Sequence, residues 1–275
     1  IFSASNVSSG LSNIPAGIFA DMYRKKIAWF LAIAMLSIAI GYFLLGTLRI
    51  YPIIILAVVL MGFGQSFWHA PAFGTLAARY PNKKGFALSM HLTGAQIGNT
   101  IGPPLVGGLI SGIAIRSIIS FEGFGWEKVS VFMAIPMIIT GLLVLVLFKS
   151  AGSESKGNWS FDEYKTRSKG LLKDKIILGL ILLGGIRASA HTSFLLFLAV
   201  YLKEVLNYSA FVIGFHIALI TAAGIISTPI MGMLSDKYGR KSIIMIAMTL
   251  MSIFLFLFLI FKTGIGLIIL ISLLG

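Results

Sequence analysis

The sequence predicts an all-α protein that crosses a membrane several times, and three observations lead to this prediction. Of its 275 residues, 57% are hydrophobic and 11% are charged, whereas a soluble domain has about 25% charged residues. The mean hydropathy is +0.97. Apolar runs at 27–47, 129–148 and 242–261 are each close to the roughly 20 residues that cross a bilayer as a helix. A water-soluble core cannot bury so many runs of this kind.

Hydropathy, with Gly, Pro and charged residues at the ends of the apolar runs, predicts nine helical segments. They cover about 1–20, 27–47, 51–78, 85–114, 128–148, 175–202, 209–233, 242–261 and 264–275. The polar stretch 149–175 is rich in Ser, Gly and Lys and predicts a linker. We therefore expect an N-terminal helical bundle at 1–148 and a C-terminal bundle at 176–275. Because the chain opens on Ile1 and closes within an apolar run, we expect a piece of a longer protein.

Positive charge is distributed unevenly along the chain, which has a net charge of +13. Of the 22 Lys and Arg residues, 16 fall in four connections, at 21–26, 79–84, 149–175 and 237–241. The positive-inside rule places these connections in the cytoplasm, as we expect for a multi-pass protein of the plasma or inner membrane. The basic excess therefore reflects topology, and no nucleic acid is expected as a partner. The absence of Cys excludes disulfides and thiol-ligated metals.

A short charged pattern occurs twice, as "GIFADMYRKK" at 17–26 and "GMLSDKYGRK" at 232–241. Each copy has a glycine, three further residues, an aspartate, and then a tyrosine among basic residues. A proline precedes each copy, at Pro15 and Pro229. Both copies fall on the predicted cytoplasmic side, at equivalent places in the two halves. Internal duplication of this kind is typical of secondary transporters.

The second copy resembles the cytoplasmic loop signature of the major facilitator superfamily, G-x-x-x-D-R/K-x-G-R-R/K. The match is complete, through Gly232, Asp236, Gly239 and Arg240. The first copy shares Gly17 and Asp21 but has Arg24 where the family has its second glycine. The resemblance implies that Asp21 and Asp236, with Arg240 nearby, latch the cytoplasmic side shut; the alternative is that they hold the turn geometry.

The resemblance covers the whole chain, as family helices 2 to 9 and the start of helix 10, and implies a two-bundle fold with internal repeats that is truncated at both ends. The stretch "GNTIGPPLVGG" at 98–108 looks like the glycine-proline signature of drug/proton antiporters. The stretch "FWHAPAFGTLAARYP" at 67–81 is similar to the fosmidomycin-resistance branch of exporters. The small residues and the first proline of this stretch have two interpretations. In the first, they let helices pack closely and bend the helix; in the second, which the resemblance implies, they form a hinge or a seal against leakage. The residues are Gly98, Gly102, Pro103, Gly107 and Gly108.

Polarity separates the predicted segments into two kinds. Those at 27–47, 128–148 and 242–261 contain almost no polar residues, whereas the segments between them are visibly more polar. Polar groups in hydrocarbon are costly unless they face protein or water. We therefore expect the oily segments at the lipid periphery and the polar ones around an interior cavity.

Arg187 is the foremost candidate for a substrate site, because it lies near the middle of the segment at 175–202. A charged residue there costs about 2.5–3.5 kcal/mol on insertion scales, so it is expected to face a wet cavity or a partner. His191 lies one helical turn further on and shares its face. Together they predict a site that attracts an anion beside a titratable group. The alternative is a structural bond from Arg187 to a carbonyl or carboxylate.

Other substrate or coupling candidates are polar side chains within predicted helices. They are Gln65, His69, Gln96 and Asn99. None of the nine acidic residues lies in the middle of a predicted segment, so proton coupling falls to a histidine or to a part of the protein outside this sequence. His69 is the best placed for this role; a packing hydrogen bond is its alternative.

These features favour a secondary active transporter that works by alternating access and exports a small organic molecule, anionic or drug-like, in exchange for protons. An importer or uniporter of the same superfamily is the nearest alternative. An enzyme would need convergent catalytic groups, which the sequence lacks, and a transport-inactive sensor is the remaining class. We expect a monomer in the lipid bilayer, with no cofactor and no metal.

Overall fold

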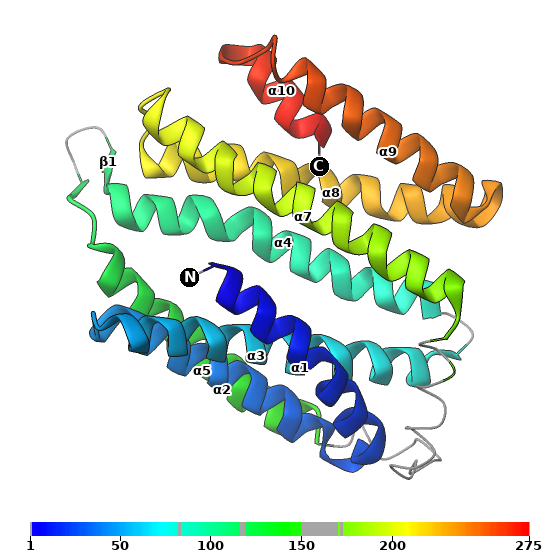
Figure 1. The fold of residues 1–275 in the computed structure, drawn as a ribbon. Coiled ribbons are helices and arrows are strands. Elements are labelled where there is room, and N and C mark those ends of the chain that lie inside the picture. Colours follow the sequence, from blue (N-terminus) through cyan, green and yellow to red (C-terminus); the bar gives the residue numbers. More distant parts are fainter. Residues whose placement is uncertain (1, 82–83, 116–118, 150–169, 171–172, 275) are drawn as a thin grey trace. The chain divides into compact units, whose positions relative to one another are not determined.

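The computed structural model describes residues 2–81, 84–115, 119–149, 170 and 173–274 (Figure 1). This part of the chain is overwhelmingly helical, which confirms the predicted all-α membrane fold. Its helices are α1 (Phe2–Met22), η1 (Arg24–Lys26), α2 (Ile27–Thr47), α3 (Tyr51–Arg79), α4 (Lys84–Ser111), α5 (Trp126–Leu147), α7 (Lys175–Glu204), α8 (Ala210–Tyr238), α9 (Arg240–Leu257) and α10 (Gly264–Leu274). Most of the predicted linker at 149–175 lies outside the described residues.

Five helical stretches in the described part are long and apolar enough to cross a membrane. They are Arg24–Thr47, Tyr51–Arg79, Trp126–Leu147, Lys175–Glu204 and Ala210–Met231. Lys241–Leu257 and Gly264–Leu274 are shorter apolar helices. The predicted segments and the observed helices differ by at most five residues at either end, and the largest difference is in α8, which continues to Tyr238 where the prediction ends at 233.

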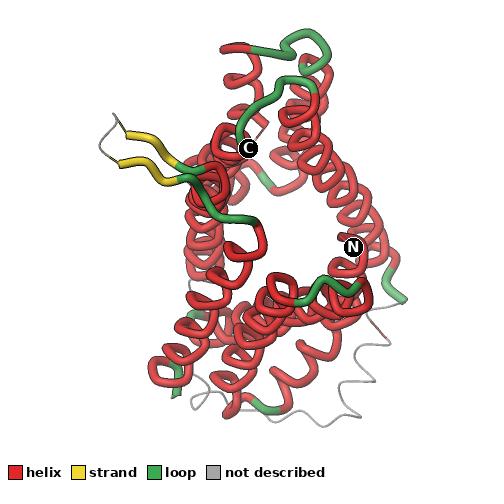
Figure 2. The backbone as a smooth tube through the Cα atoms, turned by 90° about the vertical axis from the view of Figure 1, so that its left-hand side faces the viewer, coloured by secondary structure: helices red, strands yellow, loops and turns green. Residues whose placement is uncertain are grey.

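The connection between α4 and α5 contains a short β-hairpin that the sequence did not predict (yellow in Figure 2). Strands β1 (Ile113–Ile115) and β2 (Ile119–Phe121) are antiparallel, and Ala114 pairs with Ser120. Gly112 ends α4 in a left-handed conformation with φ of +77°, which glycine adopts at low cost. The isoleucines that follow favour the extended backbone.

The described residues form two compact units. Unit 1 comprises residues 1–84 and 125–184, and unit 2 comprises 85–124 and 185–275. These units follow the contacts between helices, whereas the two bundles predicted at 1–148 and 176–275 are divided by the predicted linker at 149–175. The bundle boundaries therefore stay a prediction.

In unit 1, α2 packs against both α3 and α5, and α1 packs against α3. Glycines let these helices approach closely. A Cβ atom added to Gly64 of α3 would lie 2.5 Å from the Ala34 carbonyl oxygen of α2, and one added to Gly46 of α2 would lie 2.7 Å from Val131 Cγ2 of α5. Small residues at helix contacts are the usual means of close packing in membranes.

Serine hydroxyls join the helices of unit 1 by hydrogen bonds to the backbone. Ser37 Oγ of α2 donates to the Leu60 carbonyl of α3 at 2.7 Å, and Ser8 Oγ of α1 donates to the Val59 carbonyl at 2.7 Å. These bonds satisfy polar groups that would be costly within an apolar span.

Unit 2 has a core of large aliphatic side chains. Leu198 and Leu202 of α7 pack with Ile220 of α8 and with Leu267 and Ile271 of α10. The Tyr201 hydroxyl donates to the Lys262 carbonyl at 3.0 Å, just before α10 begins. The second half of α7 is thereby fixed in unit 2.

Candidate transport site and loop motifs

Arg187 lies within α7, where no turn or helix end is near. Twelve residues of the helix precede Arg187 and seventeen follow it. Its Cα atom therefore lies about 18 Å along the helix axis from the nearer helix end. Its side chain is exposed, and that of His191 one turn later is half-buried. No carboxylate among the described side chains of unit 2 forms an ion pair with Arg187. Arg187 and His191 thus lie on consecutive turns of α7.

Gln96 and Asn99 lie on α4, one turn apart from each other and next to a hydrogen bond between helices. Asn99 is exposed and Gln96 is half-buried. Thr100 Oγ1 lies 2.9 Å from Thr221 Oγ1 of α8, and the Thr221 hydroxyl donates to the Ala218 carbonyl at 3.0 Å. Gln96, Asn99 and Thr100 therefore place polar groups on one side of α4, and Thr100 contacts α8 there.

The helices α4 and α8 cross through one glycine on each. A Cβ atom at Gly107 would meet the carbonyl of Ala210, and one at Gly214 would meet the carbonyl of Pro103. The Ser111 hydroxyl also accepts a hydrogen bond from the Phe211 amide at 3.2 Å. The end of α4 meets the start of α8, so the two helices are antiparallel. Gly214 was not a sequence candidate, because its partner lies more than a hundred residues away in the chain.

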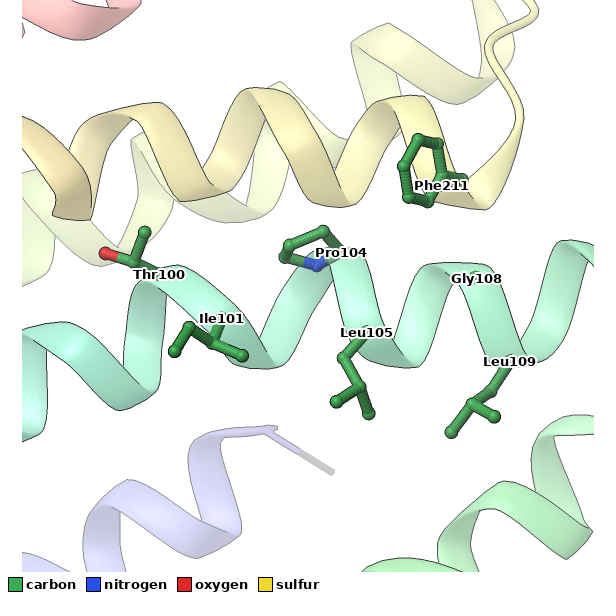
Figure 3. A pocket seen from close by; sticks show the side chains of 7 residues that line it. All are labelled: Thr100, Ile101, Pro104, Leu105, Gly108, Leu109 and Phe211. Atoms are coloured by element: carbon green, nitrogen blue, oxygen red, sulfur yellow. The ribbon is translucent and has the colours of Figure 1, made fainter. Parts of the chain in front are cut away.

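A pocket of about 550 Å³ lies beside this crossing (Figure 3). Its lining comes from α4 and from one residue of α8: Thr100, Ile101, Pro104, Leu105, Gly108, Leu109 and Phe211. Pro104 points toward α8, whereas Leu105 and Leu109 point away from it (Figure 3). The lining carries no charged group, so the pocket cannot supply the counter-charge that an anion requires.

The glycines of the 98–108 stretch occupy different surroundings. An added Cβ at Gly98 or Gly102 would meet no atom within 4 Å, whereas one at Gly107 would collide with the α8 backbone. Gly108 is buried and lines the pocket. Pro103 lies inside α4 and its carbonyl faces Gly214. Close packing is therefore observed at Gly107, and a hinge role stays a prediction for the whole group.

In unit 1, Gln65 and His69 lie one turn apart on α3. Gln65 is exposed, and the His69 ring stacks on Phe73 with ring centroids 5.7 Å apart. Trp68 packs against the core formed by α1, α2 and α3, so packing accounts for it without a ligand. In unit 2, His216 is buried and its Nδ1 donates to the Val212 carbonyl at 2.8 Å, which supports the packing interpretation for that histidine.

In the first loop motif, the chain turns in the short 3₁₀ helix η1 and has no glycine at the turn. Asp21 and Arg24 form an ion pair with an N–O distance of 3.5 Å. The Tyr23 ring stacks on Phe19 at a centroid distance of 6.3 Å, and the Lys26 ammonium lies 5.8 Å from the Tyr23 ring centroid. Arg24, which replaces the family glycine, thus pairs with the aspartate of its own motif.

The second loop motif turns at Gly239, which has φ of +86° and joins α8 directly to α9. A side chain is disfavoured in this left-handed conformation, so a loop with Arg24 at the corresponding position must turn differently. Gly232 and Asp236 lie in α8 and Arg240 begins α9, but the structure does not describe the contacts of these three residues. The two loops therefore differ in backbone structure, and the role of either as a latch stays a prediction.

The described residues contain no group of three or more His, Cys, Asp and Glu side chains that could hold a metal ion. Several apolar spans and glycine-mediated contacts between helices define a multi-pass helical membrane protein. Residues 1–275 match the profile of the Major Facilitator Superfamily, and the chain belongs to this family. It is therefore a secondary transporter and not an enzyme. A search of curated protein sequences finds no significant match.

Proposed function

We propose that the protein exports a small organic anion from the cytoplasm in exchange for protons. The observation that carries this proposal is Arg187, an exposed cation in the middle of α7 with His191 one turn away. Desolvating a cation in hydrocarbon is expensive. The presence of Arg187 in an apolar helix is explained if its guanidinium group faces a hydrated pathway and pairs there with the anionic group of a substrate.

An arginine suits this role because its planar guanidinium can bind a carboxylate or a phosphonate through two parallel hydrogen bonds. His191 shares the face of Arg187 and is a residue that can bind and release a proton. Exchange requires that proton and anion bind at different stages of the transport cycle, because a protonated His191 beside a bound anion would favour co-transport of the two. His69 of unit 1 is the second candidate for this proton.

The direction of transport rests on sequence likeness. The stretch at 98–108 resembles the glycine-proline signature of drug/proton antiporters, and the stretch at 67–81 is similar to the fosmidomycin-resistance exporters. The concentration of Lys and Arg in four connections supports a plasma or inner membrane orientation with 149–175 in the cytoplasm. An importer or uniporter with the same anion site is the second candidate. We propose that the transporter acts as a monomer.

Everted membrane vesicles that contain the full-length protein test this proposal. A proton gradient, acid inside, is imposed, and its dissipation is followed after addition of fosmidomycin as an anion, ethidium as a cation or chloramphenicol as a neutral drug. Proton release on addition of the anion, beyond that of vesicles without the protein, supports anion/proton exchange. Release on addition of the cation alone would contradict the anion site, and silence with all three while the protein is folded would favour an importer or uniporter.

A further inference from the structure

One face of α2 is exposed along the length of the helix, although its other sides are packed against α3 and α5. The exposed face consists of large apolar side chains at intervals of four, three, four and three residues, which places them in one row along the helix. They are Trp29, Ile33, Leu36, Ile40 and Phe43, and between 36% and 60% of each is exposed. We refer to these five residues as the α2 outer face.

Two lysines lie at the end of α2 that the positive-inside rule places in the cytoplasm. Lys25 and Lys26 precede Trp29 by four and three residues, about one helical turn, and both are exposed. Lys26 is the N-cap residue of α2, so the positive end of the helix dipole lies at the same place. The α2 outer face therefore begins at a concentration of positive charge.

The charges of this first loop do not cancel. Asp21 pairs with Arg24 at 3.5 Å, and that pair carries no net charge. No ion pair joins Lys25 or Lys26 to a carboxylate among the residues that the structure describes. The Lys26 ammonium lies 5.8 Å from the Tyr23 ring centroid, and this cation–π contact leaves its charge intact. Two positive charges therefore remain beside the start of the α2 outer face.

The length of the α2 outer face matches one leaflet of a bilayer. Trp29 is an aromatic residue of the kind that is enriched at the membrane–water interface. Ile40 follows eleven residues later, about 16 Å along the helix axis, which is close to half of the roughly 30 Å hydrocarbon core. An acyl chain of the cytoplasmic leaflet can therefore lie along this face while its headgroup is level with the two lysines.

We propose that Lys25, Lys26 and the α2 outer face form a binding site for an anionic phospholipid. The lipid phosphate accepts hydrogen bonds from the two ammonium groups, and an acyl chain lies along the apolar row. Lipid of any kind covers an apolar helix face in a membrane, and the two unpaired charges select an anionic headgroup. A zwitterionic lipid gains less from the lysines, because its own ammonium group neutralises its phosphate. The site uses no residue of the candidate substrate site, so the proposal holds for an exporter and an importer alike.

Fluorescence quenching by brominated lipids tests the proposal, because Trp29 belongs to the α2 outer face. The full-length protein, with Trp29 as its one remaining tryptophan, is reconstituted in mixtures of phosphatidylglycerol and phosphatidylcholine with identical acyl chains, and each lipid is brominated in turn. The quenching gives the relative affinity of the two lipids beside Trp29. Phosphatidylglycerol should be preferred by at least about fivefold, the effect of one lysine near an anionic headgroup, and the preference should weaken at high salt.

The double variant Lys25→Gln/Lys26→Gln should bring this preference close to one, because it removes both charges and keeps polar side chains. Lys128→Gln is the matched control. Lys128 is also exposed, but it lies in the first turn of α5, at the opposite end of unit 1, and its replacement should leave the preference unchanged. Size-exclusion chromatography shows whether each variant is folded; if the double variant is not, Lys25→Gln alone should at least halve the preference.

Equal affinity for the two lipids, or a preference that persists without the lysines, would overturn the proposal. An absence of quenching by either lipid would also overturn it, because protein would then cover Trp29. Glycerol 3-phosphate in millimolar excess, at constant ionic strength, distinguishes a lipid site from a site for a soluble phosphate. It should leave the preference unchanged; a loss of the preference would show that the lysines bind a phosphate without the apolar face, and would reject the lipid site.

Discussion

Unit 1 and unit 2 use their small and polar residues in different ways. In unit 1, the contacts of α2 with α3 and of α1 with α3 each run through a glycine, at Gly64 and Gly62, and serine hydroxyls bond across them. In unit 2, the glycine-mediated crossing is that of α4 with α8, and the first part of α7 exposes Arg187. Glycines thus bring helices together in both units, whereas an exposed cation within a long apolar helix occurs in unit 2, at Arg187.

The largest effect on stability is expected in unit 1, from Gly62→Leu. A leucine there would collide with the Ser5 backbone of α1, and a helix backbone cannot move aside as a flexible side chain can. Overpacking of this kind costs about 3 kcal/mol or more when the neighbour is rigid. The melting temperature of the purified protein in detergent measures the effect.

Gly10→Leu is the matched control, because an added side chain at Gly10 meets open space. It should leave the melting temperature equal to or slightly above that of wild type, because leucine favours the helix more than glycine does. If the two variants melt alike, then the α1–α3 contact in unit 1 is not as close as described.

A smaller pair of effects, opposite in sign, is expected on α4 in unit 2. Gly107→Ala should destabilise the protein by about 1–3 kcal/mol, since the methyl group would meet the backbone of Ala210 in α8. Gly98→Ala meets nothing within 4 Å and should stabilise by up to about 1 kcal/mol through helix propensity. Urea or thermal unfolding of both variants gives the sign of the change in the free energy of unfolding. If both changes had the same sign, the close contact with α8 at Gly107 would be contradicted.

The smallest effect is expected from the ion pair between Arg49 and Glu127, which joins the α2–α3 connection to the first turn of α5 at 2.7 Å. The Arg49 side chain is 75% exposed, and exposed pairs contribute about 0–1 kcal/mol. Arg49→Ala should therefore lower stability slightly, and the difference from wild type should shrink at high salt. A large, salt-independent loss would show that Arg49 packs in unit 1 instead of pairing at its surface.

Helix positions could be predicted closely from the sequence. The segment at 27–47 agrees with α2 at both ends, and that at 51–78 ends one residue before α3 does. Apolar runs interrupted by charged residues and glycines carry this information locally. The β1–β2 hairpin was missed because six strand residues between two helices give too short a pattern to separate from a loop.

Partners across the fold could not be predicted in the same way. The sequence shows many serines near the start of the chain, but not that Ser8 bonds to Val59 while Asn6 and Asn13 stay exposed. It shows glycines at 98, 102 and 107, but not that Gly107 alone of these three meets α8. A glycine permits close approach, and the approaching helix comes from a distant part of the chain. Arg187, in contrast, could be identified as a candidate from the sequence alone, because a charged residue within an apolar run has a known free-energy cost.

The most direct test of the transport account compares Arg187→Ala with Lys203→Ala in everted vesicles, using anion-driven proton release as the readout. Both substitutions remove one cation from α7, but Lys203 lies in its last turn and outside the proposed site. Arg187→Ala should fold normally and lower the rate by about 10- to 100-fold, the equivalent of one charge-assisted hydrogen-bonded pair, whereas Lys203→Ala should resemble wild type. Equal rates for wild type and Arg187→Ala would contradict the account and leave Arg187 a structural residue.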